Sequence, residues 1–587
     1  MRPVSDRDRL MKITFRDLLL IQILSSLSTF VGPLIDGIII SDFLGSDYMA
    51  AFGLVTPITV LIAATANIFN AGSQNVAGKY LGQGRSDKLN GLLTSTVLWG
   101  AAVGLVITLL LLFGGKPVLT VLGAEGKTLN ICTDYVNMYA IGIVPTVLMP
   151  SLVGFLQMDN GGKTAVAASV VLTGCDVVFD FLAVLVFKNG MIGIGLATSF
   201  SYVLALLVLL THFLKKNVRL HFTGKGSPGK DIKKVLLCGL PAATFLLCNA
   251  LRVSVTNNII LGVSNLASVA AFSIQNTIRP LTIAFTVGTG ITSLLVCSVI
   301  SGEENRHALR KELSYILKLG MLIALLLTAA ILLLARYPLA LLFCIGQPEA
   351  FIELVTSVIR QFGVSIPFAM LNVIFIYYYQ SMRRLWLSTV ISVLQNVVFY
   401  LAAAKLLSTV MGVDGIWLGY IVSEVLTLLT IVVITWGKNA RFPKSVHDFL
   451  LLPESFGVSA ENRMNVTAVT LEDAVGISER IAAFCRDRGI DSRRSMAAAL
   501  CTEELAVLAV QNGRAEKTYV DIYLTYKNGE LSIRMRDNSR PFDRRLLAGI
   551  PEADDPGAHV GVRLVKGLAR EITYHVVLGM NTYSMVI

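Results

Sequence analysis

Long apolar stretches, separated by short polar segments, recur along the chain up to about residue 437. Each stretch is long enough for a membrane-spanning helix, which needs roughly 20 predominantly apolar residues. The pattern predicts twelve spans, near residues 17–41, 50–72, 92–114, 132–156, 164–187, 191–213, 234–260, 267–299, 313–336, 354–378, 386–407 and 412–436. The sequence therefore predicts an α-helical polytopic membrane protein with a C-terminal region outside the membrane.

The composition agrees with a membrane location and excludes other classes of protein. Hydrophobic residues make up 54% of the 587 residues and charged residues only 15%, which is unlike a soluble globular chain. We attribute the net charge of +11 to basic loops, because the sequence shows no nucleic-acid-binding motif. The eight cysteines stand singly, without the spacing of a metal site or a disulfide framework.

Lysine and arginine set the expected orientation. If the N-terminus is cytoplasmic, the cytoplasmic segments hold most of these residues, and cytoplasmic loops are typically the basic ones. The opposite loops then hold only Lys116, Lys127, Lys188, Arg336 and Lys405. An even number of spans places the C-terminus in the cytoplasm as well. We therefore expect a multi-pass protein of the inner membrane with both termini inside.

The second half of the membrane region repeats the first. "AAFGLVTPI" at 50–58 matches "AAFSIQNTI" at 270–278, and "DVVFD" at 176–180 matches "NVVFY" at 396–400. Gly82 also aligns with Gly302, and all three matches share one offset of 220 residues. This repeat predicts two parallel six-helix bundles, residues 1–225 and 226–437, as in transporters whose site lies between two bundles.

The composition changes after the last span. A basic linker, residues 438–465, leads to a soluble region, residues 466–587. The residue pattern of this region predicts helices at 471–489, 492–511 and 560–569, a hairpin around Asn528-Gly529, and a final strand pair. Its predicted apolar core consists of Ile477, Ile481, Leu500, Leu505, Ile522, Leu531, Ile533, Leu564 and Leu568. The expected fold is a small cytoplasmic α/β sandwich.

Three aspartates, Asp36, Asp176 and Asp180, lie away from the ends of predicted spans, where an ionised carboxylate is costly. Asp176 and Asp180 are four residues apart and face one side of a helix, and Asp36 lies at a depth similar to that of Asp180. Burial raises the pKa of a carboxyl group, and a bound cation lowers it. Such a cluster can therefore exchange a proton or a sodium ion. We therefore predict a cation-coupling site at Asp36, Asp180 and Asp176, with no other metal and no catalytic residue.

The second half carries Asn396 and Tyr400 at the positions of Asp176 and Asp180. The fold thus accepts neutral residues there, and the acids belong to the first bundle alone. The alternative is that the carboxylates only hydrogen-bond to neighbouring backbone in a kinked helix. Glu424, in the last span, is expected only to hydrogen-bond inside the second bundle.

Three motifs resemble those of the multidrug and toxic compound extrusion (MATE) family. They are "PLIDGIIISDFLG" in the first span, "AGSQNVAGKYLGQGRSDKLNG" between the second and third, and "CDVVFDFLAV" in the fifth. The resemblance covers about residues 15–437. It implies a twelve-span exporter that alternates between inward-open and outward-open states, with the cation carried at Asp36 and Asp180. That pattern commonly has asparagine at the position of Asp176, which leaves a proton and a sodium ion as alternatives.

The tail resembles the histidine-kinase-like ATPase fold of anti-sigma-factor kinases. "CTEELAVLAVQNG", "RMRDNSRPFD" and "HVGVRLVKGLA" resemble its three nucleotide boxes, and they place Glu503, Asp537 and Gly561 at matching positions. However, Val507 stands where that family has a magnesium-binding asparagine, and Ser539 and His559 replace glycines. These departures argue against ATPase or kinase activity. They favour a module that binds a cytoplasmic regulatory protein, with ATP binding as the alternative.

The sequence thus predicts a proton- or sodium-coupled antiporter that exports small amphipathic or cationic organic compounds and contacts membrane lipids, without nucleic acid. One alternative is a lipid-linked saccharide flippase of a related fold, which needs a basic central cavity. Arg252 and Arg279 are the candidates for such a cavity. The other is a membrane sensor that signals through its tail, although a sensor has no need for a matched pair of buried acids.

Overall fold

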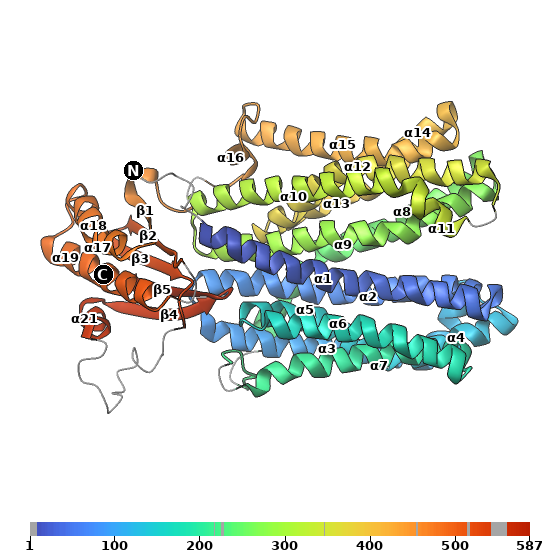
Figure 1. Ribbon diagram of the computed structural model, residues 1–587, viewed down its shortest axis with the longest axis horizontal. Helices are drawn as coiled ribbons and strands as arrows, with labels where there is room; N and C mark the ends of the chain where they lie inside the picture. The colour runs from blue at the N-terminus through green and yellow to red at the C-terminus, as the bar shows by residue number, and fades with distance from the viewer. Residues whose placement is uncertain are drawn as a thin grey trace.

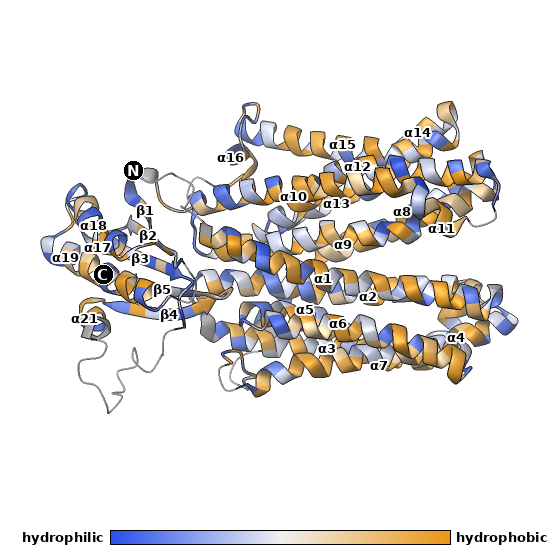
Figure 2. Cartoon of the chain, in the orientation of Figure 1, coloured by the Kyte–Doolittle hydropathy of each residue, from blue (hydrophilic) through white to orange (hydrophobic). Residues whose placement is uncertain are grey.

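The computed structural model describes residues 9–215, 218–224, 228–344, 347–453, 456–513, 517–541 and 560–587. A long helical region carries an α/β domain, here called the tail, at one end (Figure 1). Apolar residues dominate the helical region and polar residues are more frequent in the tail (Figure 2). The structure confirms the predicted fold class, a helical polytopic membrane protein with an α/β tail.

The first half of the membrane region forms one bundle, here called the N-lobe. Its helices are α1 (Arg9–Ile39), α2 (Ser46–Gly82), α3 (Ser86–Val121), α4 (Gly126–Ala140), α5 (Ile143–Met158), α6 (Gly162–Phe181) and α7 (Gly190–Leu210). Short π-helical segments, Ile40–Leu44 and Leu182–Val186, continue α1 and α6.

The second half forms the C-lobe, which lies beside the N-lobe (Figure 1). Its helices are α8 (Pro228–Val263), α9 (Leu266–Gly302), α10 (Arg306–Leu334), α11 (Leu341–Phe343), α12 (Glu349–Ser381), α13 (Leu385–Val393), α14 (Phe399–Met411) and α15 (Val413–Asn439). π-Helical segments, Ala335–Ala340 and Leu394–Val398, join α10 to α11 and α13 to α14.

Within the described residues, eleven helices are long and apolar enough to cross a membrane. The pair α4 and α5, which is bent by 47°, corresponds to the span expected near 132–156, and the number is twelve if this pair is counted as one span. Pro145 has no backbone N–H to continue the hydrogen bonding of α4 into α5. Gly142 fills the break, where an added Cβ would lie 2.6 Å from the Cα of Ser199.

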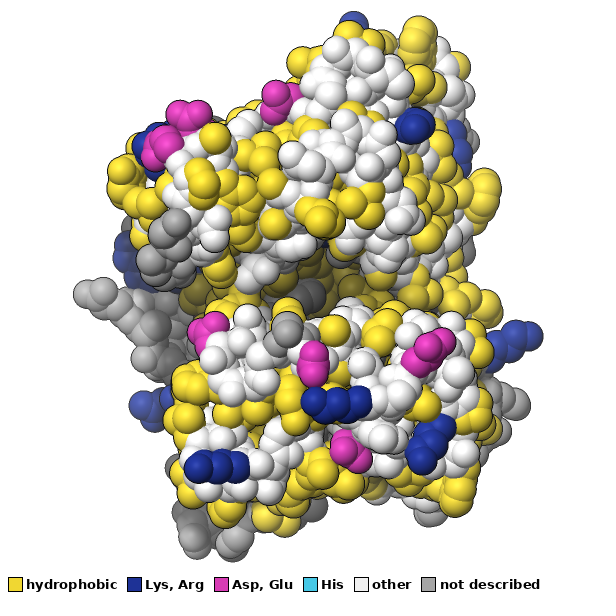
Figure 3. All heavy atoms as spheres, turned by 90° about the vertical axis from the view of Figure 1, so that its right-hand side faces the viewer, with side chains coloured by type: hydrophobic (Ala, Val, Ile, Leu, Met, Phe, Trp, Pro, Cys, Tyr) yellow, Lys and Arg dark blue, Asp and Glu magenta, His cyan; other side chains and the backbone are white. Residues whose placement is uncertain are grey.

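The two lobes meet at the helix ends nearest the tail, here called the tail side. Glycines let α2 approach α8 and α9 there: an added Cβ on Gly239 would lie 2.0 Å from the carbonyl oxygen of Ile68, and one on Gly82 would lie 2.0 Å from that of Val299. At the opposite end, the far side, a hollow separates the lobes (Figure 3). The structure is therefore closed on the tail side and open on the far side.

The tail is a five-stranded antiparallel sheet in the order β1-β2-β3-β5-β4. The strands are β1 (Arg463–Ala468), β2 (Val520–Lys527), β3 (Glu530–Asp537), β4 (Glu571–Val577) and β5 (Met580–Val586). Helices α17 (Leu471–Val475), α18 (Ile477–Arg486), α19 (Ser492–Gln511) and α21 (Val560–Leu568) lie on the side away from the lobes (Figure 1). The sheet therefore turns its other face toward the membrane region.

The structure changes three details of the expected tail. Strand β1 begins at Arg463, inside the segment expected to be linker, and Gly476 divides the helix expected at 471–489. Leu500, Leu564 and Leu568 are 37%, 40% and 39% exposed, so they are not core residues. The other six predicted core residues are buried.

Part of the expected linker packs on the C-lobe. It forms the short helix α16 (Val446–Phe449), and the hydroxyl of Tyr378 donates a hydrogen bond of 2.9 Å to the carbonyl oxygen of Leu450. Burial alone would raise the pKa of Asp448. Hydrogen bonds from the backbone N–H groups of Lys444 and Ser445 and from Arg441 instead lower this pKa to about 2. The chain is therefore anchored to the C-lobe before it enters the tail.

Candidate functional site

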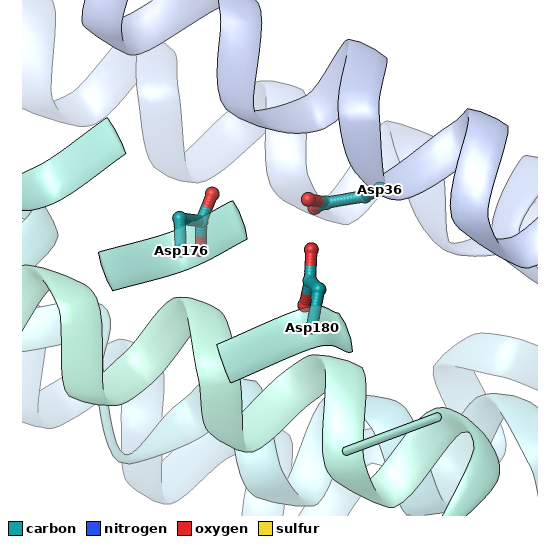
Figure 4. Close-up of side chains that lie close together, drawn as sticks. All are labelled: Asp36, Asp176 and Asp180. Atoms are coloured by element: carbon teal, nitrogen blue, oxygen red, sulfur yellow. The ribbon is translucent and has the colours of Figure 1, made fainter. Parts of the chain in front are cut away.

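The three aspartates singled out in the sequence converge inside the N-lobe (Figure 4). Asp36 comes from α1, and Asp176 and Asp180 come from successive turns of α6. Each offers a carboxylate oxygen, and these oxygens all lie within 4.8 Å of one another. The side chains are only 2%, 5% and 0% exposed. The structure thus brings the expected residues together, and their role in coupling stays a prediction.

The cluster lacks the partners that buried carboxylates normally have. One oxygen of Asp36, one of Asp176 and both of Asp180 have no hydrogen-bond partner among the described residues. Three ionised carboxylates this close would repel one another, and burial would deprive them of hydration. A bound cation or added protons would remove this cost. Carboxylate oxygens also suit a hard cation such as sodium.

Gly32 explains how α1 and α6 can pack around these acids. An added Cβ on Gly32 would lie 2.7 Å from Oδ2 of Asp176. Any larger side chain at this position of α1 would displace the carboxylate. The glycine therefore keeps room beside Asp176, a contribution that the sequence analysis missed.

The repeat gives the C-lobe a different chemistry at the equivalent place. At the shared offset of 220 residues, Gly32 aligns with Arg252 and Asp180 with Tyr400. The guanidinium of Arg252 lies 5.1 Å from the ring centre of Tyr400 and 5.4 Å from that of Tyr420. The N-lobe thus has a glycine and carboxylates at this place, whereas the C-lobe has the positively charged side chain of Arg252 against two aromatic rings. The register of the repeat could have revealed this contrast.

Glu424 is satisfied within the C-lobe, as the sequence analysis expected. Its carboxylate accepts hydrogen bonds from the side-chain amides of Asn372, at 2.8 Å, and Gln395, at 2.7 Å. These bonds compensate for its burial, so Glu424 needs no external cation.

A cavity lies between the lobes and contains no charged residue among the side chains that line it in the described chain. Its polar lining comes from Gln22, Ser25, Ser26, Thr29, Asn67, Asn70, Thr146, Tyr202, Asn249 and Tyr377, and residues such as Phe245 and Ile283 supply apolar surface. Arg252 and Arg279 are buried and do not line it, although Nη2 of Arg252 donates a hydrogen bond of 2.9 Å to Oδ1 of the lining residue Asn249. The cavity is therefore amphipathic rather than basic.

The expected nucleotide residues of the tail are only partly described. Asp537 is fully buried at the end of β3 and accepts hydrogen bonds from the backbone of Ser539, at 2.8 Å, and the side chain of Asn581, at 2.7 Å. Burial raises the pKa of the Asp537 carboxyl, and these hydrogen bonds only partly offset that shift. Glu503 is half-buried in α19, and Gly561 lies in the first turn of α21. His559 lies outside the described residues.

Comparison with known families identifies the membrane region. The sequence profile of the MatE family matches residues 22–182 and 241–404, which together are more than half of the chain. The chain belongs to the MATE family. A second profile, the histidine kinase-like ATPase domain, matches residues 467–587 of this MATE chain. Both resemblances seen in the sequence are thereby confirmed.

Curated relatives agree with this assignment. The chain is 21% identical over 427 residues to the multidrug export protein MepA of Staphylococcus aureus (strain MRSA252), covering 71% of this chain and 93% of that protein. It is 24% identical over 239 residues to the multidrug export protein MepA of Staphylococcus saprophyticus, covering 40% and 52%. For the relative from S. aureus strain NCTC 8325, the match spans about half of the protein, 50% of its length.

Solved structures share the fold of the membrane region. An outward-facing multidrug resistance MATE family transporter has a TM-score of 0.68 at 21% identity, covering 71% of this chain and 93% of that one. A MOP superfamily transporter from Pyrococcus furiosus has a TM-score of 0.67 at 21% identity, covering 73% and 95%. At this identity the likeness shows the fold alone.

Proposed function

We propose that this MATE chain is a cation-coupled antiporter that exports small amphipathic or cationic organic compounds by alternating access. The observation that carries the proposal is the buried cluster of Asp36, Asp176 and Asp180, whose unpaired oxygens call for a proton or a sodium ion. Because the C-lobe holds Arg252 at the equivalent place, we assign the coupling site to the N-lobe alone.

The cavity between the lobes supports the substrate class. Its amide and hydroxyl groups suit compounds that combine hydrogen-bonding groups with apolar surface. The relatives named multidrug export proteins point to the same class. A lipid-linked saccharide flippase is disfavoured, because a pyrophosphate would need basic groups in a cavity whose described lining has none.

An imposed ion gradient tests this function directly. In inverted vesicles, whose cytoplasmic face is outside, we expect uptake of an amphipathic dye to follow a proton or sodium gradient directed outward from the lumen. An ion moving down a potential supplies about 2.3 kcal/mol per charge for each 100 mV. A tag after Ile587 should be accessible in these vesicles, which checks the expected cytoplasmic C-terminus. Dye uptake that is independent of both the proton and the sodium gradient would contradict the proposed cation coupling.

We also propose that the tail regulates transport and does not energise it. A chain cut after Leu452 keeps α16 on the C-lobe, so it should insert and still export the dye in the same vesicles. The full-length protein should show no ATP turnover above that of its Glu503→Ala variant, because Val507 replaces the magnesium-binding asparagine. Loss of export in the shortened chain, or ATP turnover that Glu503→Ala removes, would assign the tail to the transport mechanism.

A further inference from the structure

The tail contacts the C-lobe through buried charges at the end of α9. Glu303, whose side chain is 4% exposed, pairs with Arg536, which is 9% exposed, and lies 3.7 Å from Arg534. Both arginines come from β3, and their contacts with Glu303 place their side chains on the side of the sheet that is turned toward the lobes. Glu304 adds a second, exposed pair with Lys527 at 3.5 Å. Breaking a buried charge pair costs much more than breaking an exposed one, so Glu303 and Arg536 dominate this contact.

The same tail also contacts the N-lobe. Nη1 of Arg536 lies 3.5 Å from the sulfur of Met11 in α1, so one side chain reaches both lobes. The guanidinium of Arg219, between α7 and α8, lies 5.8 Å from the ring centre of Tyr574. The tip of the β4–β5 hairpin approaches the loop between α5 and α6, where an added Cβ on Gly579 would lie 3.8 Å from Oδ1 of Asn160.

The turn of that hairpin shows that its sequence is adapted to docking. Two hairpins in the tail have the same left-handed turn: φ is 53° and 80° at Asn528-Gly529, and 52° and 80° at Leu578-Gly579. Asparagine suits this conformation, whereas leucine is strained in it. Nevertheless Leu578 is only 5% exposed, and it belongs to the same buried apolar cluster as residues of the membrane helices. The buried contact explains why the strained leucine stands there.

We propose that the docked tail is a clasp that holds the tail-side ends of the two lobes together and so restrains opening toward the tail side. The inference rests on alternating access, in which those ends must separate once in each cycle. Contacts of the tail with Glu303 on one lobe and with Met11 and Asn160 on the other cannot all persist through that separation. The tail therefore releases one lobe each time the inward side opens, and anything that undocks it speeds the cycle.

The distance between the two lobes tests the clasp in the full-length chain. Spin labels on Lys88→Cys in α3 and Arg310→Cys in α10, both exposed near the tail side, report the separation of the lobes. The native cysteines are replaced first, and the protein is measured in lipid nanodiscs without substrate or gradient. The intact chain should show predominantly the short distance of the structure.

Two variants should release the clasp without unfolding the tail. Arg536→Gln removes the charge that reaches both lobes, and Leu578→Asn suits its turn better while removing the apolar contact. Each should raise the population with separated lobes by roughly three- to tenfold. The controls are Arg493→Gln and Leu471→Asn, which change exposed residues of the tail helices and should leave the distances unchanged.

Distance distributions identical to the parent in both Arg536→Gln and Leu578→Asn would overturn the clasp. A shift that also appears in both controls would overturn it too, because the effect would then be a general one of tail mutation. This measurement needs no ion gradient, so a failure of cation coupling in the vesicle assay would leave its outcome interpretable.

Discussion

Replacement of Asp180 by Asn should reduce ion-driven efflux to the passive leak while leaving membrane insertion intact. The amide keeps the size and polarity of the side chain but cannot carry a proton or neutralise a cation. Both oxygens of Asp180 lack a hydrogen-bond partner in the described chain, so the change breaks no internal bond. Tyr400 at the equivalent place of the C-lobe shows that this fold accepts a neutral residue there. Efflux from proteoliposomes under an imposed proton or sodium gradient measures the effect.

Related variants separate the roles of the three acids. Asp36→Asn should behave like Asp180→Asn, because both carboxylates belong to one cluster. Asp176→Asn should change the preferred ion rather than stop transport, since the family pattern commonly has asparagine there. Asp47→Asn is the matched control, because Asp47 is exposed and its ion pair, with Lys127 at 3.2 Å, lies on the far side. Undiminished efflux by the Asp180→Asn variant would contradict the assignment of the cation-coupling site to this cluster.

Substitution of Gly82 by Ala should disfavour the state seen in this structure and slow transport strongly. An added Cβ would lie 2.0 Å from the carbonyl oxygen of Val299 and 2.9 Å from the Cα of Gly302, which are backbone atoms that cannot rotate away. The lobes must then move apart on the tail side. Overpacking of this kind typically costs about 1–3 kcal/mol, which shifts a two-state population by roughly 5- to 150-fold.

The spin-label distances and the dye assay together measure this effect. Gly302→Ala should act like Gly82→Ala, because its Cβ would lie 2.4 Å from the carbonyl oxygen of Lys79 across the same contact. Gly91→Ala is the control, since an added Cβ there meets no atom within 4 Å. Normal transport and an unshifted lobe distance in Gly82→Ala would show that this contact does not define the closed tail side.

Several properties of the site could be predicted because they are local or periodic. Asp176 and Asp180 share a helix face through their spacing of four residues, and Asp36 is the only acid of its predicted span that lies away from the ends of the span. Other features had no local signal. Arg252 was singled out for a basic cavity, yet the structure places its guanidinium against Tyr400 and Tyr420, behind the lining residue Asn249 to which it donates a hydrogen bond.

In the tail, too, some features could be predicted from the local sequence and others could not. The hairpin at Asn528-Gly529 was predicted, because this dipeptide favours a left-handed turn by itself. In the hairpin at Leu578-Gly579 only the glycine favours such a turn. The leucine is explained only by its burial against the membrane region. Leu500, Leu564 and Leu568 were placed in the core because an amphipathic helix does not reveal where its buried face ends.

The sequence by itself determined the membrane region, its internal repeat, the three buried acids and the α/β tail. Hydrophobic length, a constant offset and short motifs are properties of neighbouring residues, and they survive without knowledge of distant contacts. Only the tertiary structure placed Gly32 beside Asp176 and Arg536 between Met11 and Glu303. Those contacts join segments more than a hundred residues apart, and no local pattern records which distant side chain will fill a given space.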